Sequence, residues 1–299
     1  MRFIERHFDY VLGPGQDARL ASVAPGQTIE LQLPLDSDAP FFLRSRAMRV
    51  SYDSLRRQTG LNHLLLRWAN SVHKFQSQNF VRQSLLGPYF GQLGNPIPVE
   101  PEVAYPRQGA IRVDVLNDGA SALSNVTLYF RGVKRYAPGS VKAYTYPAKF
   151  GPLPFVYSKP LVENLPVVTA GVRYVFECKT DADFVMRGGQ CGSPFSGTPV
   201  NEVFITMRDE DEKPYSNAPV HMDVLFGNAD AGAIYPAGTS AGVAPVGAGP
   251  QAPGLFYPEI YVPKNHIMYF DVARNDIAYG GAVPVTLPLL FHGMKVFEK

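Results

Sequence analysis

A few side chains in this sequence could do chemistry, and the most reactive of them is a cysteine. Cys191 lies in the stretch RGGQCGSPFSG, where the flanking glycines could expose a nucleophilic thiol. A nucleophilic cysteine needs a base beside it, and the sequence alone brings none of the six histidines to this position. We therefore favour an inert role for Cys191 as a small apolar residue near a turn.

Histidine and paired carboxylates offer possible metal ligands. His221-x-Asp223 could present two ligands on one strand face, but no further histidine stands at a spacing that completes a site. The pairs Asp36-x-Asp38 and Asp181-x-Asp183 recur at equivalent places and could bind Ca²⁺. A calcium site needs several more oxygen ligands, and Asp is also a turn-forming residue, so we favour turns.

Two further candidates concern surfaces. Trp68, with Tyr and Phe nearby in the sequence, could belong to a platform on which sugars stack, although large aromatic residues also fill the core of a β-sandwich. We favour the core for Trp68. The stretch RDEDEKP (208–214) is best interpreted as a solvated acidic turn.

The motifs of the common enzyme classes are absent from the sequence. There is no Walker A loop, no dinucleotide-binding glycine motif, no G-x-S-x-G, no H-E-x-x-H and no paired C-x-x-C. We therefore expect a protein that is not an enzyme, and we assign no catalytic, cofactor-binding or metal-binding residue.

Composition indicates a globular, turn-rich protein. Hydrophobic residues make up 45% of the 299 residues and charged residues 18%, which argues against disorder and suggests a fairly apolar surface. The 27 prolines and 27 glycines, with 19 Phe and 16 Tyr, favour strands and turns over long helices. Only Cys178 and Cys191 are present, and although they could form a disulfide, we favour two free thiols.

Charge and hydropathy argue against two classes of partner. The net charge is +2, and no block of basic residues stands out, so we expect no direct nucleic-acid binding. Charges are scattered through the first residues, and no apolar stretch reaches the length of a membrane span. We expect neither a signal peptide nor a membrane-spanning segment.

An internal repeat carries most of the structural information. FRGVKRY (130–136) and FHGMKVF (291–297) share Phe, Gly, Lys and a final aromatic residue at the same spacing. Upstream, PEVAYPRQGAIRVDVLN (101–117) parallels PEIYVPKNHIMYFDVARN (258–275), and both place an Asp eight residues after the second Pro, at Asp114 and Asp271. Further upstream, 26–44 parallels 171–187, each with Gly, an Asp-x-Asp pair and an Arg. Three matches in the same order indicate a duplication.

Each copy has the alternation of half-buried strands. Ile29, Leu31 and Leu33 alternate with polar residues, and NDGAS (117–121) supplies a turn between two later strands. The sequence therefore predicts an all-β protein with two tandem antiparallel β-sandwiches of jelly-roll-like size. The expected bounds are an N-terminal arm (1–25), a first sandwich (26–136), a Pro- and Tyr-rich connector (137–170) and a second sandwich (171–299) with a long loop (227–254).

One segment is ambiguous. Residues 51–75 form the best helical candidate, with apolar residues that include Leu61, Leu64 and Trp68, but Gly60 interrupts it, and a strand for HLLLRWA is equally consistent with the pattern.

The repeat marks also carry a family resemblance. PFFLRS after an Asp-x-Asp pair, PEVAYPRQGAIRVDVLND and NVTLYFRGVKRY together resemble small β-rich virion proteins encoded among the structural genes of tailed bacteriophages. The resemblance covers both copies and contains no catalytic residue. The second copy departs from it, with His292 in place of Arg131 and with the 227–254 insertion, so the two halves are expected to have different neighbours.

The resemblance implies a structural component of a virion, made in the host cytoplasm and assembled through contacts with itself and with other virion proteins. A minor capsid or decoration protein and a head–tail or tail-complex protein both fit this description. Two alternatives remain open: a carbohydrate-binding module for host recognition, for which a buried Trp68 would remove the best residue, and a double jelly-roll major capsid protein, which copy number per particle would identify.

Overall fold

The chain folds into two compact units. The computed structural model describes residues 3–50, 64–69, 80–82, 97–140, 150–165, 172–178, 181–191, 203–226, 254–274 and 285–298. Unit 1 comprises Met1–Phe90 and Pro96–Val141, and unit 2 comprises Gly91–Asn95 and Lys142–Lys299.

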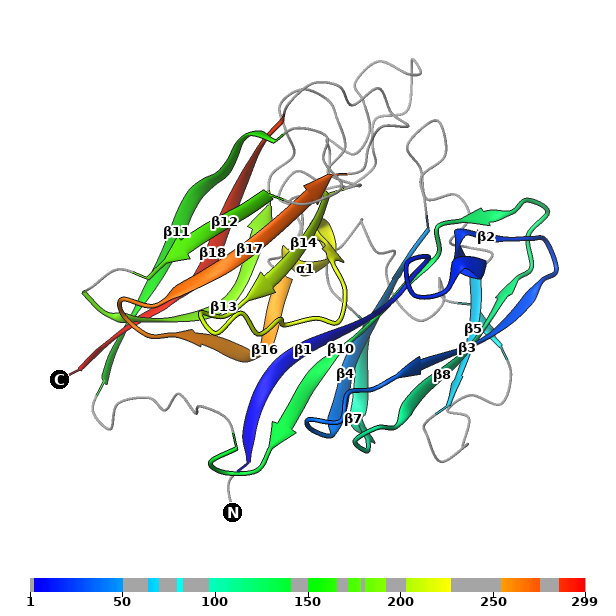
Figure 1. Cartoon of the computed structure of the whole chain (residues 1–299), viewed down its shortest axis with the longest axis horizontal. Helices are drawn as coiled ribbons and strands as arrows, with labels where there is room; N and C mark the ends of the chain where they lie inside the picture. Colours follow the sequence, from blue (N-terminus) through cyan, green and yellow to red (C-terminus); the bar gives the residue numbers. More distant parts are fainter. Residues whose placement is uncertain are drawn as a thin grey trace. The chain divides into compact units, whose positions relative to one another are not determined.

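The described residues of unit 1 form antiparallel strands and one 3-10 turn (Figure 1). Its described strands form two four-stranded sheets, ordered β1-β10-β4-β7 and β3-β8-β5-β6, and the short strands β2 and β9 pair with each other. The elements are β1 (Ile4–Leu12), η1 (Ala18–Ala21), β2 (Ser22–Val23), β3 (Thr28–Pro34), β4 (Phe41–Arg49), β5 (Leu64–Ala69), β6 (Val81–Arg82), β7 (Ile97–Tyr105), β8 (Ala110–Asn117), β9 (Leu123–Ser124) and β10 (Thr127–Tyr136).

Unit 2 repeats this construction. Its described strands form two four-stranded sheets, ordered β11-β18-β13-β16 and β12-β17-β14-β15 (Figure 1). The elements are β11 (Phe150–Leu165), β12 (Val172–Glu177), β13 (Asp183–Cys191), β14 (Val203–Arg208), β15 (Val220–His221), α1 (Met222–Phe226), β16 (Gly254–Val262), β17 (Ile267–Arg274) and β18 (Val285–Glu298).

The two units share one topology. When β2 and β9 are set aside, one sheet of each unit contains the first, eighth, third and sixth strands in that order, and the other contains the second, seventh, fourth and fifth. This order is that of a jelly roll, in which two Greek keys form a sandwich. The predicted all-β fold with a duplicated, jelly-roll-like sandwich is confirmed.

Alternating side chains build the core of unit 1. In β3 every second residue is buried, so that Ile29, Leu31 and Leu33 face the interior while their neighbours are exposed. Each such side chain contributes about 1.5–3 kcal/mol when it is removed from water. The same cluster includes Val113 and Val115 from β8 and extends to the opposite sheet.

The repeated glycine of F-x-G-x-K lies in β10 where this strand pairs closely with β4, and in β18 where this strand pairs closely with β13. A Cβ atom on Gly132 would lie 2.0 Å from the carbonyl oxygen of Phe42, and one on Gly293 would lie 2.1 Å from that of Val185. Only glycine allows the two backbones to approach in this way. The glycine in both motifs therefore has a packing cause that is the same in each unit.

A β-bulge occurs in both units at the arginine that ends the first pair of matching segments (26–44 and 171–187). The ladders of β4 shift register between Leu43 and Ser45, which leaves Arg44 as the extra residue. The ladders of β13 shift register between Met186 and Gly188, which leaves Arg187 as the extra residue. A bulge turns the following side chains to the opposite face of the sheet.

The second proline of each P-E-x-x-x-P mark ends a strand and begins a turn. Pro106 follows β7 and Pro263 follows β16, and the amide three residues later donates to the proline carbonyl at 3.0 and 3.1 Å. Gln108 and Asn265 occupy the same place in these turns, with φ of 56° and 66°. The proline marks are therefore equivalent turns in the two units.

Each unit begins earlier in the chain than the sequence predicted. The N-terminal arm (1–25) contains β1, which pairs along its length with β10, and the connector (137–170) contains β11, which pairs with β18. Both are edge strands, and β11 carries three prolines, which edge positions tolerate. Proline content made the second of these strands look like a linker.

Other expectations fall partly outside the described residues. The part of 51–75 that the structure describes is strand β5 (Leu64–Ala69), which agrees with the strand alternative for HLLLRWA. The loop at 227–254 lies outside the described residues except for Gly254, which begins β16. The expectation of an apolar surface is not met in the described residues, where Phe3 and Val175 are the only exposed large hydrophobic side chains.

Candidate functional site

A buried lysine joins two repeat marks in each unit. Lys134 Nζ lies 2.5 Å from Asp36 and 3.1 Å from Asp38, and Lys295 Nζ lies 2.5 Å from Asp181. The two lysine side chains are only 4% and 7% exposed. Both aspartates of the first Asp-x-Asp pair and the first aspartate of the second pair therefore neutralise a buried ammonium group, which gives them a structural role.

The second aspartate of the later pair has a different role. Asp183 accepts hydrogen bonds from the hydroxyl of Tyr261 and from the amide of Lys264, at 2.9 Å for the amide. In unit 1 both aspartates contact the lysine, and Asp38 also accepts from Tyr136 at 2.7 Å. Burial raises the pKa of Asp38, but the hydrogen bond from Tyr136 and the lysine charge leave it below its ordinary value.

A ring of four alternating charges crosses one sheet of unit 1. Glu5 of β1 and Glu102 of β7 each bridge Arg44 of β4 and Arg135 of β10. The four nitrogen–oxygen distances lie between 2.5 and 3.1 Å. Although burial raises the pKa of Glu102, hydrogen bonds from the two arginines lower it below its ordinary value. The ring ties together all four strands of the sheet.

Unit 2 keeps only part of this ring. Arg187 and Glu259 occupy the places of Arg44 and Glu102, and their side chains pair at 2.8 Å. Val296 stands where unit 1 has Arg135, so the second arginine is missing. The repeat therefore preserves the pair next to the bulge and changes the outer part of the sheet.

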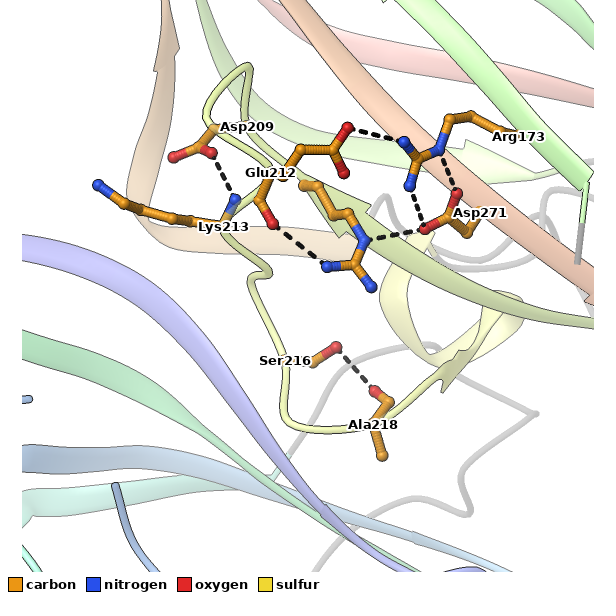
Figure 2. Close-up of polar contacts among 8 residues, drawn as sticks. Arg173, Asp209, Glu212, Lys213, Ser216, Ala218 and Asp271 are labelled. Atoms are coloured by element: carbon orange, nitrogen blue, oxygen red, sulfur yellow. Dashed lines mark hydrogen bonds and ion pairs between the residues drawn. The ribbon is translucent and has the colours of Figure 1, made fainter. Parts of the chain in front are cut away.

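A second polar cluster covers the outer face of the other sheet in unit 2 (Figure 2). Asp271 of β17 accepts from Arg173 of β12 at 2.8 Å and from Arg208 of β14 at 2.9 Å, and Glu212 accepts from Arg173 at 2.7 Å. Hydrogen bonds from Arg173 and then Arg208 lower the pKa of Asp271 despite partial burial. Three neighbouring segments of the sheet face are linked by these contacts.

The predicted acidic turn at 208–214 forms the edge of this cluster. Asp209 accepts from the backbone amide of Lys213 at 2.8 Å, and Glu212 has a φ of 62° (Figure 2). In unit 1 the matching Asp114 pairs with Arg67 of β5 at 2.6 Å. Asp114 and Asp271, which the repeat aligned, thus both bind an arginine from the adjacent strand.

A buried charged group in unit 1 was not found from the sequence. Asp9 of β1 lies 3.1 Å from Arg131 Nε of β10 and 3.2 Å from His7 Nε2. Burial raises the pKa of Asp9, but the charge of Arg131, followed by His7, lowers it below its ordinary value. The available sequence signal is that charged residues interrupt the apolar positions of 1–16, which also argues against a signal peptide.

Two of the sequence candidates for catalysis and metal binding have side chains outside the described residues. Cys191 ends β13, but its side chain lies outside the described residues, and Cys178 is buried with its thiol 3.5 Å from the carbonyl oxygen of Ala182. His221 is buried with its ring centroid 4.2 Å from that of Phe204, while the side chain of Asp223 is not described. Within the described residues, no three His, Cys, Asp or Glu side chains are grouped so that they could hold a metal ion.

Trp68 lies in the core of unit 1. Its side chain belongs to the buried cluster and is 8% exposed. The preference for the core is confirmed, and a surface sugar platform loses its best residue. No helix in the described part of the chain is long and apolar enough to cross a bilayer.

Comparison with known proteins gives distant structural likenesses. No protein-family model and no curated protein matches the sequence. The major capsid protein (MCP) of Sulfolobus turreted icosahedral virus (STIV) is 14% identical with a TM-score of 0.28, covering 97% of each chain. PNGase F, a glycosylasparaginase from Flavobacterium meningosepticum, is 11% identical with a TM-score of 0.23, covering 97% of this chain and 96% of that chain.

These likenesses are too low to carry an argument about function. The assignment of both units as jelly rolls rests on the strand orders described above. The likenesses include a viral capsid protein and a glycosylasparaginase, and they are not specific to tailed bacteriophages.

Proposed function

We propose that this chain is a double jelly-roll subunit of a viral capsid, located in the virion and assembled through contacts with itself and with other virion proteins. One observation supports the proposal above all: both units have the same jelly-roll strand order. Both also have a glycine at the same close contact between paired strands and a bulge at the same arginine. Jelly rolls build viral capsid proteins, although the fold also occurs in lectins and cupins. The proposal gives the chain no enzymatic activity and no cofactor.

The polar surface of the described residues fits assembly by specific contacts. Non-obligate interfaces between proteins are on average no more apolar than the rest of a protein surface. The charge ring of unit 1 and the cluster around Asp271 differ between the units, so the two units present different surfaces to neighbours. This agrees with the expectation that the two halves contact different partners.

Copy number in purified particles tests the proposal. A capsid subunit should be among the most abundant proteins of the particle by quantitative mass spectrometry. A minor band would favour a decoration, head–tail or tail-complex protein, and absence from particles would refute a virion role. The tailed-bacteriophage setting stays a prediction, which the presence of portal, terminase and tail genes beside this gene would support.

A carbohydrate-binding function is the second candidate, and the burial of Trp68 counts against it. Glycan-array binding by a protein that is strictly monomeric in light scattering would reverse this order.

A further inference from the structure

Lys134 of β10 ends against two carboxylates in the segment between β3 and β4. Its Nζ lies 2.5 Å from an oxygen of Asp36 and 3.1 Å from one of Asp38, and the lysine side chain is 4% exposed. On its other side, Nζ lies 3.7 Å from the centre of the ring of Phe8, which belongs to the core cluster. The amine is therefore shielded from water while it contacts a carboxyl group.

Two tyrosine hydroxyls hold the carboxylates in position. Tyr10 donates to Asp36 Oδ2 at 3.0 Å, and Tyr136 donates to Asp38 Oδ2 at 2.7 Å. Although burial raises the pKa of Asp38, the hydrogen bond from Tyr136 and the charge of Lys134 lower it below its ordinary value. At neutral pH Asp38 is therefore ionised and can accept a proton.

A lysine amine and an aspartate carboxyl group in contact can condense to an amide. Because Nζ lies 2.5 Å from Asp36 Oδ2 and a carboxyl C–O bond is about 1.2 Å long, Cγ of Asp36 lies within about 3.7 Å of Nζ. Well-oriented reacting groups at about 3–3.5 Å have effective concentrations of about 10⁵–10⁸ M. Holding the two groups together in this way removes the entropic cost that stops free amines and acids from condensing in water.

We propose that Lys134 and Asp36 form an intramolecular isopeptide bond, with Asp38 as the proton carrier. Asp38 takes one proton from the ammonium group, and the neutral amine attacks Cγ of Asp36. The Nζ–Cγ bond forms and the Cγ–Oδ2 bond breaks. Oδ2 takes the proton that Asp38 carries and a second proton from the nitrogen, and it leaves as water. One proton stays on the amide nitrogen, and Asp38 returns to its carboxylate form, so no other reactant is needed.

The surroundings allow the product to leave and the bond to be kept. The two carboxylates are 48% and 46% exposed, so the released water has a path to solvent. The bond links β10 to the segment between β3 and β4, which lies 98 residues away in the sequence. The bond does not depend on the capsid function proposed above.

Unit 2 repeats the lysine contact with a different arrangement of the second aspartate. Lys295 Nζ lies 2.5 Å from Asp181, and the lysine side chain is 7% exposed. Asp183, which matches Asp38, accepts hydrogen bonds from Tyr261 and a backbone amide instead. Because Asp183 is not placed to carry a proton between Lys295 and Asp181, we assign the bond to unit 1 only.

The mass of the full-length protein tests the proposal. Mass spectrometry of the denatured protein does not detect an ion pair, whereas an isopeptide bond lowers the mass by one water molecule. We expect the wild-type protein to be one water lighter than its sequence. Lys134→Arg keeps a positive charge but removes the amine, so its mass should equal that of its own sequence. A wild-type mass equal to the sequence mass after incubation at neutral pH overturns the proposal.

Tryptic digestion locates the bond. Trypsin cleaves after arginine but not after a lysine whose amine is acylated. The bond should therefore appear as one branched peptide in which residues 20–44 are joined to residues 132–135. A loss of one water with these two segments in separate peptides also overturns the proposal.

Two matched variants test the proton carrier. Asp38→Asn leaves Lys134 and Asp36 in place and should prevent the bond, so that its mass equals that of its own sequence. Asp183→Asn changes the matching aspartate of unit 2 and should lose one water like the wild type. Circular dichroism verifies the fold of each variant, and if Lys134→Arg does not fold, the branched peptide of the wild-type protein decides. A bond that forms equally in Asp38→Asn refutes the role of Asp38.

Discussion

Replacing Gly132 by alanine should open the contact between β10 and β4. The added Cβ would lie 2.0 Å from the carbonyl oxygen of Phe42 and 2.9 Å from the ring of Phe41. A carbon atom and a carbonyl oxygen normally approach to about 3.3–3.6 Å, so the strands must separate locally by roughly 1.3 Å. Paired strands lie only about 4.8 Å apart, and a displacement of this size breaks the neighbouring hydrogen bonds.

The cost can be worked out from these contacts. Overpacking in a dense interior costs about 1–3 kcal/mol. Two lost hydrogen bonds add about 0.5–1.5 kcal/mol each. We expect Gly132→Ala to reduce the free energy of unfolding of unit 1 by about 2–6 kcal/mol, which is a large part of the 5–15 kcal/mol typical of a domain.

Urea unfolding followed by Trp68 fluorescence measures this change, because the only tryptophan lies in unit 1. With an m-value of about 2 kcal/mol/M, the unfolding midpoint should fall by roughly 2 M. Gly15→Ala is the matched control, since its Cβ would meet nothing within 4 Å. Equal midpoints for Gly132→Ala and Gly15→Ala would refute the packing explanation. Gly293→Ala should cause a comparable loss in unit 2, measured by circular dichroism.

Three further predictions concern charged groups. The double variant Asp36→Asn/Asp38→Asn should destabilise the protein more than Lys134→Met in urea unfolding. The double variant removes the negative charges beside a buried ammonium group, whereas Lys134→Met leaves two half-exposed carboxylates; the opposite order would contradict this. The pKa of Asp9 lies below its ordinary value in the folded state, so its contribution to stability is present above the unfolded pKa of about 3.9 and is lost as the pH falls below it. Unfolding midpoints between pH 2 and 7 should therefore depend less on pH in Asp9→Asn than in the wild type, and equal slopes would count against the buried ion pair. Asp271→Asn should cost about 1 kcal/mol or less at low salt and lose most of that effect at high salt, because its ion pairs are partly exposed; a cost that salt leaves unchanged would indicate a packing role.

The sequence repeat predicted strands and turns, but not the contacts between its marks. F-x-G-x-K and Asp-x-Asp lie far apart in each copy, and the structure joins them through Lys134 and Lys295. Alternation predicted the buried face of β3 because one residue in two must leave water when a sheet is covered on one side. These marks could be recognised because the same physical constraint acts twice in one chain.

Other features could not be predicted, because they depend on tertiary position. Comparison of the two copies by sequence makes Asp38 and Asp183 equivalent. In the structure Asp38 contacts the buried lysine, whereas Asp183 accepts hydrogen bonds from Tyr261 and a backbone amide. The position of Arg46 over the ring of Trp68 depends on the bulge at Arg44, and no local pattern shows that one residue has been inserted into the pairing. An arginine among strand residues is ordinarily assigned to the solvent side.

Comparison of the two units distinguishes the features that occur in both jelly rolls from those that differ between them. Three features occur in both units: the glycine that allows two paired strands to approach closely, the arginine at the bulge with its glutamate partner, and the buried lysine with its aspartate partner. The completed charge ring occurs in unit 1, whereas unit 2 has Val296 in place of Arg135. Since unit 2 keeps the same strand order without the second arginine, the completed ring is not needed for folding a jelly roll. It is therefore the place where a function specific to unit 1 should be tested first.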